Sequence, residues 1–390
     1  MLAFTAARLL TPKQVIEQPL LLVSEGRIVE VATRADRSTP PDSSLCDFAD
    51  SVIAPGYIDL HIHGHAGYDV MDKSPEALPA IERMLVAHGV TGYFPTTVTA
   101  PVEQLLGALE RLADTIEQCA SGRADRASRA VPLGIHLEGP FISHARRGVH
   151  PPENLLPPKV ETFERFWHAA RGHIKIITVA PELDGAMELI PAVVARGVRV
   201  SLGHSDAQLG AAERAINAGA RHATHIFNAM RPLGHRDPGI LGAVLTDERV
   251  TADIIADGVH LDPAIVKLVA EAKGPERTVL ITDAISATGM PDGHYHLGSI
   301  EVDVKNGMCT SGGKLAGSIL TLDKAVRNLS RYAKWDLPMA IAAASRNPAH
   351  VAGLTGRGVI SAGAQADFVV LNSEGEVLRT FLRGRECSQS

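Results

Sequence analysis

The stretch APGYIDLHIHG, residues 54–64, sets a pattern that the rest of the chain repeats. A Pro-Gly turn leads into a short apolar run, and the run ends in His61 and His63. Residues two apart on a strand point to the same face, so both imidazoles can reach one metal ion. The chain has 17 histidines, however, and His294 and His296 match the same spacing. Structural histidines therefore stay open as the alternative for this pair.

Eight short runs of β-branched and apolar residues alternate with longer amphipathic stretches of helical period. This alternation is typical of an α/β fold, a (β/α)8 barrel of the TIM type. The alternative is an open doubly wound sheet, but no G-x-G-x-x-G sequence follows the first run. The expected strands are Tyr57–His63, Val90–Thr97, Val131–Glu138, Ile174–Ala180, Val198–His204, His222–His225, Val250–Ala256 and Thr278–Asp283.

The two ends of the chain have a different pattern, with short extended runs separated by glycine-marked turns. Pro19–Ala32 reads as two strands around one such turn, and residues 356–390 are similar. Neither end has enough apolar residues for a core of its own. We therefore expect residues 1–55 and 356–390 to form one small β-sandwich domain, with 56–355 as the catalytic barrel domain. The glycine-rich segment His294–Gly317 is expected to be a lid or an active-site loop.

Composition excludes several classes of protein. The net charge of −6 has interspersed signs, and only 4% of residues are aromatic, so no nucleic acid partner is expected. No apolar run approaches the roughly 20 residues of a transmembrane helix, so no membrane partner is expected either. The cysteines lie far apart and form no CxxC pair, which favours a reducing cytoplasm. They are Cys46, Cys119, Cys309 and Cys387.

Four more residues that can carry chemistry close apolar runs. Glu138, His204 and His225 would supply three ligands to a metal ion and leave a position open for water. Asp283 would take a proton from that water and pass it to a leaving amine. The alternatives are a helix-capping role for Glu138, a core role for His204, and His222 in place of His225. Because the ends of parallel strands meet at one face of a barrel, the set predicts one metal-centred hydrolytic site.

The chain resembles the N-acetylglucosamine-6-phosphate deacetylase family of the amidohydrolase superfamily over nearly its whole length. The sequences HLEGPF and H-x-FNAM are the most specific of the shared motifs. In this family a glutamate takes the place of the carboxylated lysine of the wider superfamily, and Glu138 matches it. The resemblance is carried by Ala54–Gly64, Gly134–Ile142, Arg146–Glu153, Ser201–Ala207, His225–Met230, Ala256–His260, Ile281–Ala284 and Lys314–Ser318.

The resemblance implies a divalent metal cofactor, zinc or iron, with one or two ions per subunit. Glu138, His204 and His225 match the ligands of the first ion, and His61 with His63 would serve an optional second. Asp283 matches the catalytic acid and base. It further implies a homodimer, in which an arginine reaches the neighbouring active site. The positions that match substrate-binding residues are Val149, His150, Asn228, Ala229, Arg236, His260, Leu315, Ala316 and Gly317.

The implied reaction is hydrolysis of the N-acetyl group of N-acetylglucosamine 6-phosphate in amino-sugar catabolism and cell-wall recycling. The products would be glucosamine 6-phosphate and acetate. One alternative is the same chemistry on N-acetylgalactosamine 6-phosphate, which differs only at the sugar 4-hydroxyl. The other is a catalytically silent barrel that acts as a binding protein. The intact Glu138, His204, His225 and Asp283 argue against the silent barrel.

Overall fold

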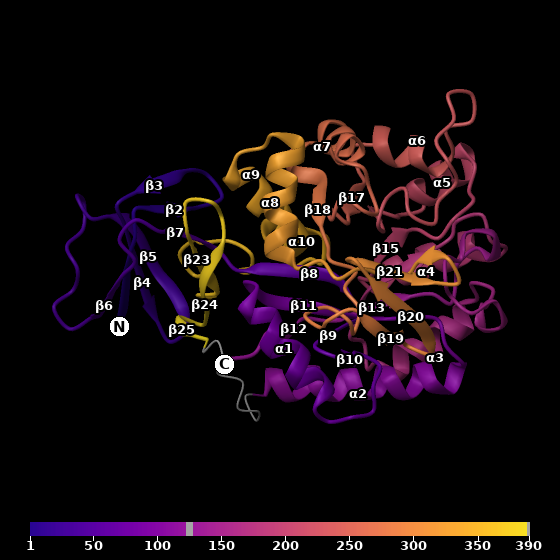
Figure 1. The fold of residues 1–390 in the computed structure, drawn as a ribbon, viewed down its shortest axis with the longest axis horizontal. Helices are drawn as coiled ribbons and strands as arrows, with labels where there is room; N and C mark the ends of the chain where they lie inside the picture. The colour runs from indigo at the N-terminus through magenta and orange to yellow at the C-terminus, as the bar shows by residue number, and fades with distance from the viewer. Residues whose placement is uncertain (122–127, 388–390) are drawn as a thin grey trace.

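A computed structural model describes residues 1–121 and 128–387 of the protein. Its centre is a barrel of eight parallel strands (Figure 1). The barrel closes because Ala284, which follows the last strand, bridges Ile62 and accepts a hydrogen bond from the His63 N–H at 2.8 Å. The predicted (β/α)8 barrel is confirmed. In order around the barrel the strands are β8 (Tyr57–Ile62), β11 (Val90–Thr97), β13 (Ile135–Glu138), β14 (Ile174–Val179), β15 (Arg199–Leu202), β16 (His222–Ala223), β17 (Thr251–Ile254) and β18 (Thr278–Leu280).

The strands are buried on both faces, which explains their apolar sequences. All eight residues of β11 are buried, since the barrel interior lies on one side and helices lie on the other. In α2 the buried positions Leu105, Leu109, Leu112 and Ile116 recur with helical period and face the strands. The helices are α1 (Ala77–Ala87), α2 (Val102–Ala120), α3 (Val160–Ala169), α4 (Ala186–Ala195), α5 (Leu209–Asn217), α6 (Gly239–Thr246), α7 (Pro263–Arg277), α8 (Leu322–Ala333), α9 (Leu337–Ala344) and α10 (Arg346–Val351).

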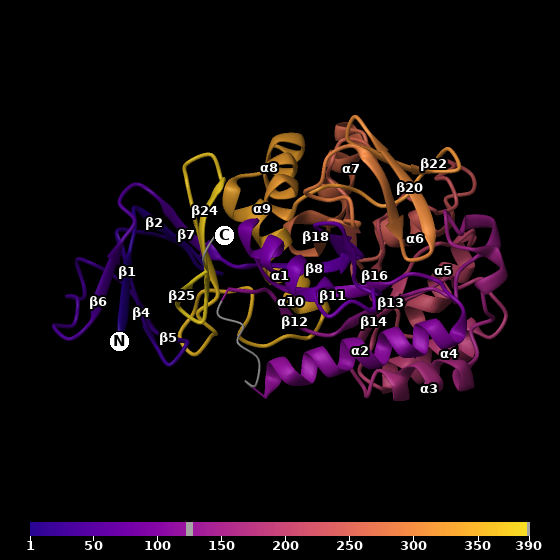
Figure 2. The same ribbon diagram turned by 60° about the horizontal axis from the view of Figure 1, so that its bottom comes forward.

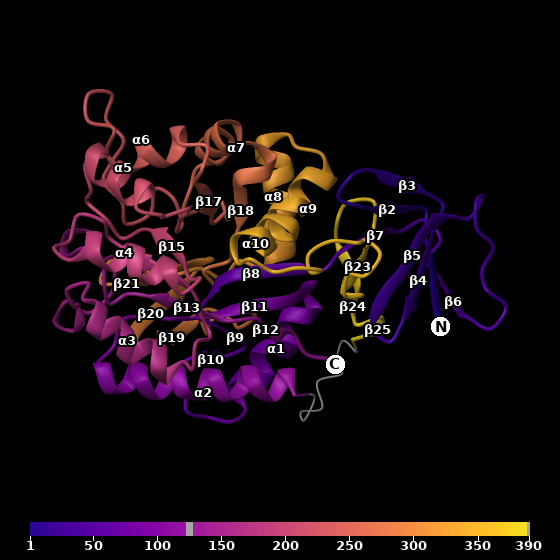
Figure 3. The same cartoon turned by 180° about the vertical axis from the view of Figure 1, so that it is seen from behind.

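Two smaller sheets lie beside the barrel, one made of N-terminal strands alone and the other of strands from both ends of the chain (Figures 1 and 3). Phe4, Phe368 and Phe381 form the centre of their shared core, and the last two rings stack with centroids 4.5 Å apart. The predicted sheets at the chain ends are confirmed, whereas the exact domain boundaries stay a prediction. One sheet orders β5 (Arg27–Thr33), β4 (Pro19–Ser24), β1 (Leu2–Thr5) and β6 (Ser44–Asp47); the other orders β25 (Arg385–Glu386), β24 (Val377–Leu382), β23 (Phe368–Leu371), β7 (Val52–Pro55), β2 (Arg8–Leu10) and β3 (Val15–Glu17).

The segment expected to be a lid or loop is an antiparallel four-stranded sheet, which we call the flap. Figure 2 shows it above the barrel. Burial alternates along its second strand because one face packs on Val98, Ile285 and Ala287. The flap strands are β19 (Gly293–Leu297), β20 (Ile300–Lys305), β21 (Met308–Ser311) and β22 (Lys314–Leu315). The remaining short elements are β9 (Gly64–His65), β10 (Tyr68–Asp69), β12 (Val131–Pro132), η1 (His144–Arg146) and η2 (Pro152–Asn154).

Over the described ranges, residues 1–121 and 128–387, no helix is long and apolar enough to cross a bilayer.

Candidate metal centre

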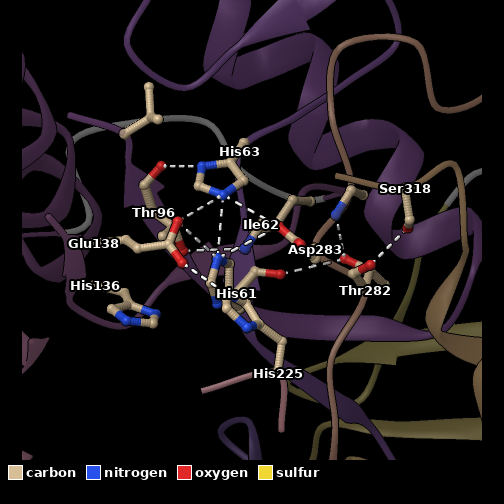
Figure 4. A network of polar contacts seen from close by, with 12 residues as sticks. His61, Ile62, His63, Thr96, His136, Glu138, His225, Thr282, Asp283 and Ser318 are labelled. Atoms are coloured by element: carbon tan, nitrogen blue, oxygen red, sulfur yellow. Dashed lines mark hydrogen bonds and ion pairs between the residues drawn. The ribbon is translucent and has the colours of Figure 1, made fainter. Parts of the chain in front are cut away.

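The structure brings the six predicted metal-site residues together at the carboxyl ends of the barrel strands. His61 and Glu138 lie on β8 and β13, and His63 follows β8 directly. The other three, His204, His225 and Asp283, lie two or three residues beyond β15, β16 and β18. Figure 4 shows five of these side chains pointing toward one another. Strands that are distant in the sequence thus build one site at the mouth of the barrel.

Three of these residues have a left-handed backbone. The φ angles of His204, His225 and Asp283 are 47°, 29° and 50°. Residues other than glycine seldom adopt this region, at a cost of about 1–3 kcal/mol each. Here the backbone leaves the strand in a sharp turn. Hydrogen bonds from surrounding elements offset the cost, such as that from the Asp283 N–H to the His61 carbonyl at 2.9 Å.

One group of ligand atoms surrounds a carboxylate oxygen of Glu138. The Oε1 atom of Glu138 lies 3.2 Å from His204 Nε2 and 3.0 Å from His225 Nε2. The two nitrogens are 3.1 Å apart. All three residues are buried and each offers one ligand atom at this point. Two imidazoles and one carboxylate are a donor set that suits zinc or iron.

A second group lies against the other oxygen of the same carboxylate. The Nε2 atoms of His61 and His63 are 3.1 Å apart, and they lie 3.4 and 3.3 Å from Glu138 Oε2. Asp283 Oδ1 lies 3.4 and 3.2 Å from the same two nitrogens. The Glu138 carboxylate thus stands between two groups of possible ligands, and each oxygen faces one of them.

The protonation of the imidazoles explains why these atoms can converge. The Nδ1 atoms of His63 and His204 contact backbone carbonyls of Thr96 and Arg146 at 2.9 and 3.0 Å. A carbonyl only accepts hydrogen bonds, so Nδ1 carries the proton and the neutral ring has a lone pair on Nε2. Lone pairs and carboxylate oxygens at this separation repel one another. A cation between them would remove the repulsion, so the residues present fit a bound metal ion.

The electrostatics of the site also favour positive charge. Burial would raise the pKa of Glu138, but the surrounding histidines hold it well below its ordinary value. Burial would likewise raise the pKa of Asp283, yet His61 and His63 lower it. For His225, burial acts to lower the pKa, and the hydrogen bond and charge of Glu138 raise it to about 9. The buried carboxylates therefore stay ionised, as ligands and a general base must.

A buried carboxylate that sequence reasoning missed holds the backbone of one ligand. Asp253 on β17 is fully buried, and its Oδ1 accepts a hydrogen bond from the N–H of left-handed His225. Its Oδ2 lies 2.9 Å from His222 Nε2. His222 therefore contacts Asp253, whereas His225 lies with Glu138 and His204 in the first group of possible ligands. The available signal was an acidic residue inside the apolar run VTADII.

A second missed carboxylate ties the first and last strands together. Asp59 Oδ2 accepts a hydrogen bond from the Thr282 hydroxyl at 2.6 Å. Its Oδ1 accepts from the N–H groups of His61 and Thr282 at 3.2 and 3.3 Å. His61 is itself a possible ligand, and Thr282 directly precedes Asp283. Asp59 therefore fixes one strand end relative to the other (Figure 4 shows Thr282). Asp59 belongs to the motif APGYIDLHIHG, two residues before His61, but no pattern in the sequence marks it as a supporting residue.

The metal-ligand groups form the floor of a pocket of about 280 Å³. Eight of the nine expected substrate-binding residues line it. Arg236 does not, because it lies in an exposed loop between β16 and α6. Gly148, Leu297 and Lys314 also line the pocket and were not among the expected residues. The eight are Val149, His150, Asn228, Ala229, His260, Leu315, Ala316 and Gly317.

Two histidines of the pocket have defined partners. His150 Nδ1 accepts a hydrogen bond from the Thr99 N–H at 3.3 Å, so its Nε2 carries the proton and can donate. Burial lowers the pKa of His150 to about 3, and His204 acts in the same direction, which keeps the ring neutral. His260 Nδ1 donates to Asp257 Oδ2 at 2.7 Å. Both rings are therefore held in fixed orientations beside the metal-ligand groups.

Comparisons with known proteins agree with this architecture. The Amidohydrolase family model matches residues 52–387. The N-acetylglucosamine-6-phosphate deacetylase of Bacillus subtilis is 36% identical over 96% of this chain and 94% of its own. The N-acetylgalactosamine-6-phosphate deacetylase of Escherichia coli O157:H7 is 36% identical over 98% of each chain. A mutant N-acetyl-D-glucosamine-6-phosphate deacetylase from Mycobacterium smegmatis, solved with N-acetyl-D-glucosamine-6-phosphate, is 34% identical, with a TM-score of 0.91 over 99% of each chain.

The support given by Asp253 predicts a change in metal affinity. The variant Asp253→Asn removes a charged acceptor from the His225 N–H, so we expect Zn²⁺ to bind about 10- to 100-fold more weakly. Competition with a chromophoric chelator measures the affinity, and circular dichroism checks the fold. Asp184→Asn, at an exposed position, is the matched control. An unchanged affinity in Asp253→Asn would remove this residue from the metal centre.

Proposed function

The chain belongs to the amidohydrolase family, and we propose that it hydrolyses the N-acetyl group of N-acetylglucosamine 6-phosphate in amino-sugar metabolism. The products are glucosamine 6-phosphate and acetate. The observation that carries the proposal is the group of Glu138, His204 and His225 at the floor of a pocket lined by Asn228 and Ala229. Relatives with this named activity are similar over nearly the whole chain.

The reaction needs a nucleophile, a general base and a proton for the leaving amine. A divalent ion held by Glu138, His204 and His225 would polarise the acetyl carbonyl and acidify a water molecule. Asp283 accepts the proton of the attacking water and then donates it to the amide nitrogen as the carbon–nitrogen bond breaks. The neutral His150 donates its Nε2–H to the developing negative charge on the carbonyl oxygen.

The rest of the pocket supplies groups for a phosphorylated sugar. The Asn228 side chain and the Ala229 N–H are proposed contacts of the phosphate, and His260 holds the sugar. Val149 and the backbone of Leu315, Ala316 and Gly317 complete the walls. These roles rest on the match to the family motifs and on the position of each residue in the pocket.

The number of metal ions follows from the two groups of ligands. Zinc or iron suits both groups, because each contains imidazole and carboxylate donors. We propose one ion at Glu138, His204 and His225, and an optional second ion at His61 and His63. Glu138 faces both groups, so it would help to hold either ion.

Arg236 takes its proposed role from an assembly of two chains. Its loop is exposed and lies outside the pocket of its own chain. In the proposed homodimer this arginine reaches the phosphate in the neighbouring subunit, where its planar guanidinium suits bidentate contact.

The proposed compartment is the cytoplasm, in keeping with four cysteines that are all free.

Hydrolysis of N-acetylgalactosamine 6-phosphate is the second candidate function. The Escherichia coli relative with that name is as similar, at 36% identity, as the Bacillus subtilis relative named for the gluco epimer. The two substrates differ only at the 4-hydroxyl. The metal-ligand groups are proposed to act on the acetyl group, which both substrates share, so these groups do not distinguish the two sugars. Direct comparison of the two substrates decides between them.

Acetate release from the two phosphorylated sugars and from unphosphorylated N-acetylglucosamine tests the function. We expect kcat/KM to be highest for N-acetylglucosamine 6-phosphate and lowest for the unphosphorylated sugar. A preference for the galacto epimer would replace the first candidate by the second. If the metal-loaded protein released no acetate from any of the three, a catalytically silent binding protein would be the better account.

The proposed role of Asp283 predicts that binding and turnover separate. In Asp283→Asn the ligands Glu138, His204 and His225 are intact, so metal content should stay near the wild-type value. The side chain can no longer accept a proton, so kcat should fall at least about 10²- to 10⁴-fold. Elemental analysis and acetate release measure the two effects, with Asp303→Asn on the flap surface as control. Near wild-type turnover would show that Asp283 is not the base.

A further inference from the structure

The pocket lining contains few charged side chains. Within residues 1–121 and 128–387, Lys314 is the only lysine or arginine among the lining residues. The two lining carboxylates are Glu138 and Asp283. A divalent ion in the proposed site would cancel those two negative charges. A phosphomonoester carries a charge of about −1.5 to −2 at neutral pH and so needs further positive charge.

Two arginines that contact residues next to the site, Arg146 at His204 and Arg231 at Ser205, are already paired with carboxylates. Arg146 Nε lies 2.7 Å from Asp206 Oδ1. Arg231 lies 3.2 Å from Asp206 and 2.6 Å from Asp237. Both arginines lie outside the lining of the pocket that contains Asn228 and Ala229. Neither arginine is therefore free to balance a phosphate without losing its partner.

Lys314 differs from these arginines in its surroundings. It is exposed on the short flap strand β22, where it pairs with Ser311 of β21. In the part of the chain that the structure describes, its ammonium group has neither an ion-pair nor a hydrogen-bond partner. Its neighbours Gly312 and Gly313 have open space around them. The side chain can thus move toward a ligand without breaking an existing contact.

The segment that follows Lys314 is anchored at the reaction centre. Four residues beyond Lys314, the Ser318 N–H donates to the Asp283 carbonyl at 2.8 Å, and the Ser318 hydroxyl donates to the Thr282 carbonyl at 2.6 Å (Figure 4). The Ala316 N–H donates to Cys309 at 3.0 Å. A fully extended chain would span at most about 13 Å over these four residues, and Gly317, with a φ of 61°, bends it. Lys314 and Asp283 line the same pocket, so a sugar whose acetyl group faces Asp283 can have its phosphate within reach of the lysine side chain.

We propose that Lys314 determines the preference for a phosphorylated substrate, by pairing its ammonium group with the phosphate of the bound amino sugar. This inference rests on the proposed function. The contact is made within one chain and adds to the proposed contact of Arg236 from a partner subunit. Because the lysine is exposed, the pairing is partly screened by water and salt. Its loss should therefore change substrate binding by about five- to tenfold and leave the chemical step unchanged.

Steady-state kinetics of Lys314→Met and Lys314→Arg test the proposal on the metal-loaded protein. The control is Lys305→Met, since Lys305 is an exposed lysine of the same flap that does not line the pocket. In Lys314→Met we expect KM for N-acetylglucosamine 6-phosphate to rise about five- to tenfold, with kcat within about twofold. The kcat/KM for N-acetylglucosamine should not change. Lys314→Arg should keep most of the affinity, and 0.5 M NaCl should reduce the difference between wild type and Lys314→Met.

Two kinetic results would overturn the proposal. One is an unchanged KM for the phosphorylated sugar in Lys314→Met. The other is an equal loss on the phosphorylated and unphosphorylated sugars, which would show a structural role in the flap.

Calorimetric binding of glucosamine 6-phosphate and glucosamine separates this proposal from the proposed function. If the wild-type protein turns over no sugar, the proposed function fails. Weaker binding of glucosamine 6-phosphate alone in Lys314→Met would then still support the phosphate contact. Equal binding by wild type and Lys314→Met would reject it.

Discussion

Electrostatic repulsion between converging lone pairs is the constraint on which the site depends. Nε2 atoms of four histidines and both oxygens of Glu138 meet within about hydrogen-bond distance of one another. Backbone carbonyls fix the proton of His63 and of His204 on the opposite ring nitrogen. Positive charge between its members stabilises such a group, whether a bound cation supplies it or protons on the imidazoles do, as the raised pKa of His225 indicates. The metal centre, the ionised Asp283 and the charge balance of the pocket all follow from this requirement.

The barrel supports the site through buried carboxylates below it. His204, His225 and Asp283 turn sharply beyond their strands, and each turn has an unfavourable backbone conformation. Asp253 and Asp59 hold two of these turns by hydrogen bonds to backbone groups and to Thr282. A carboxylate buried without such partners would be costly. Asp253 and Asp59 therefore stabilise the backbone of these turns, and they also position the possible ligands.

The sequence predicted the barrel, because apolar runs alternate with helical stretches, and it named polar residues at the run ends that the structure brings together. The eight runs beginning at Tyr57 correspond to the eight strands, and the pocket contains Glu138, His204 and His225 as expected. The sequence did not predict the supporting role of Asp253, because no sequence pattern shows which residue beyond a neighbouring strand an acidic side chain contacts. Lys314 was missed for a related reason: the flap sheet brings it to the pocket through tertiary contacts, which no spacing records.

Anomalous diffraction from crystals of the protein grown with zinc tests whether Glu138, His204 and His225 hold the metal ion. Data collected at the zinc absorption edge locate the ion without reference to activity. We expect a peak bound by Glu138, His204 and His225 at about 2.0–2.2 Å from their ligand atoms. A zinc peak at other residues, with these three side chains outside its coordination shell, would contradict the assignment of the metal centre.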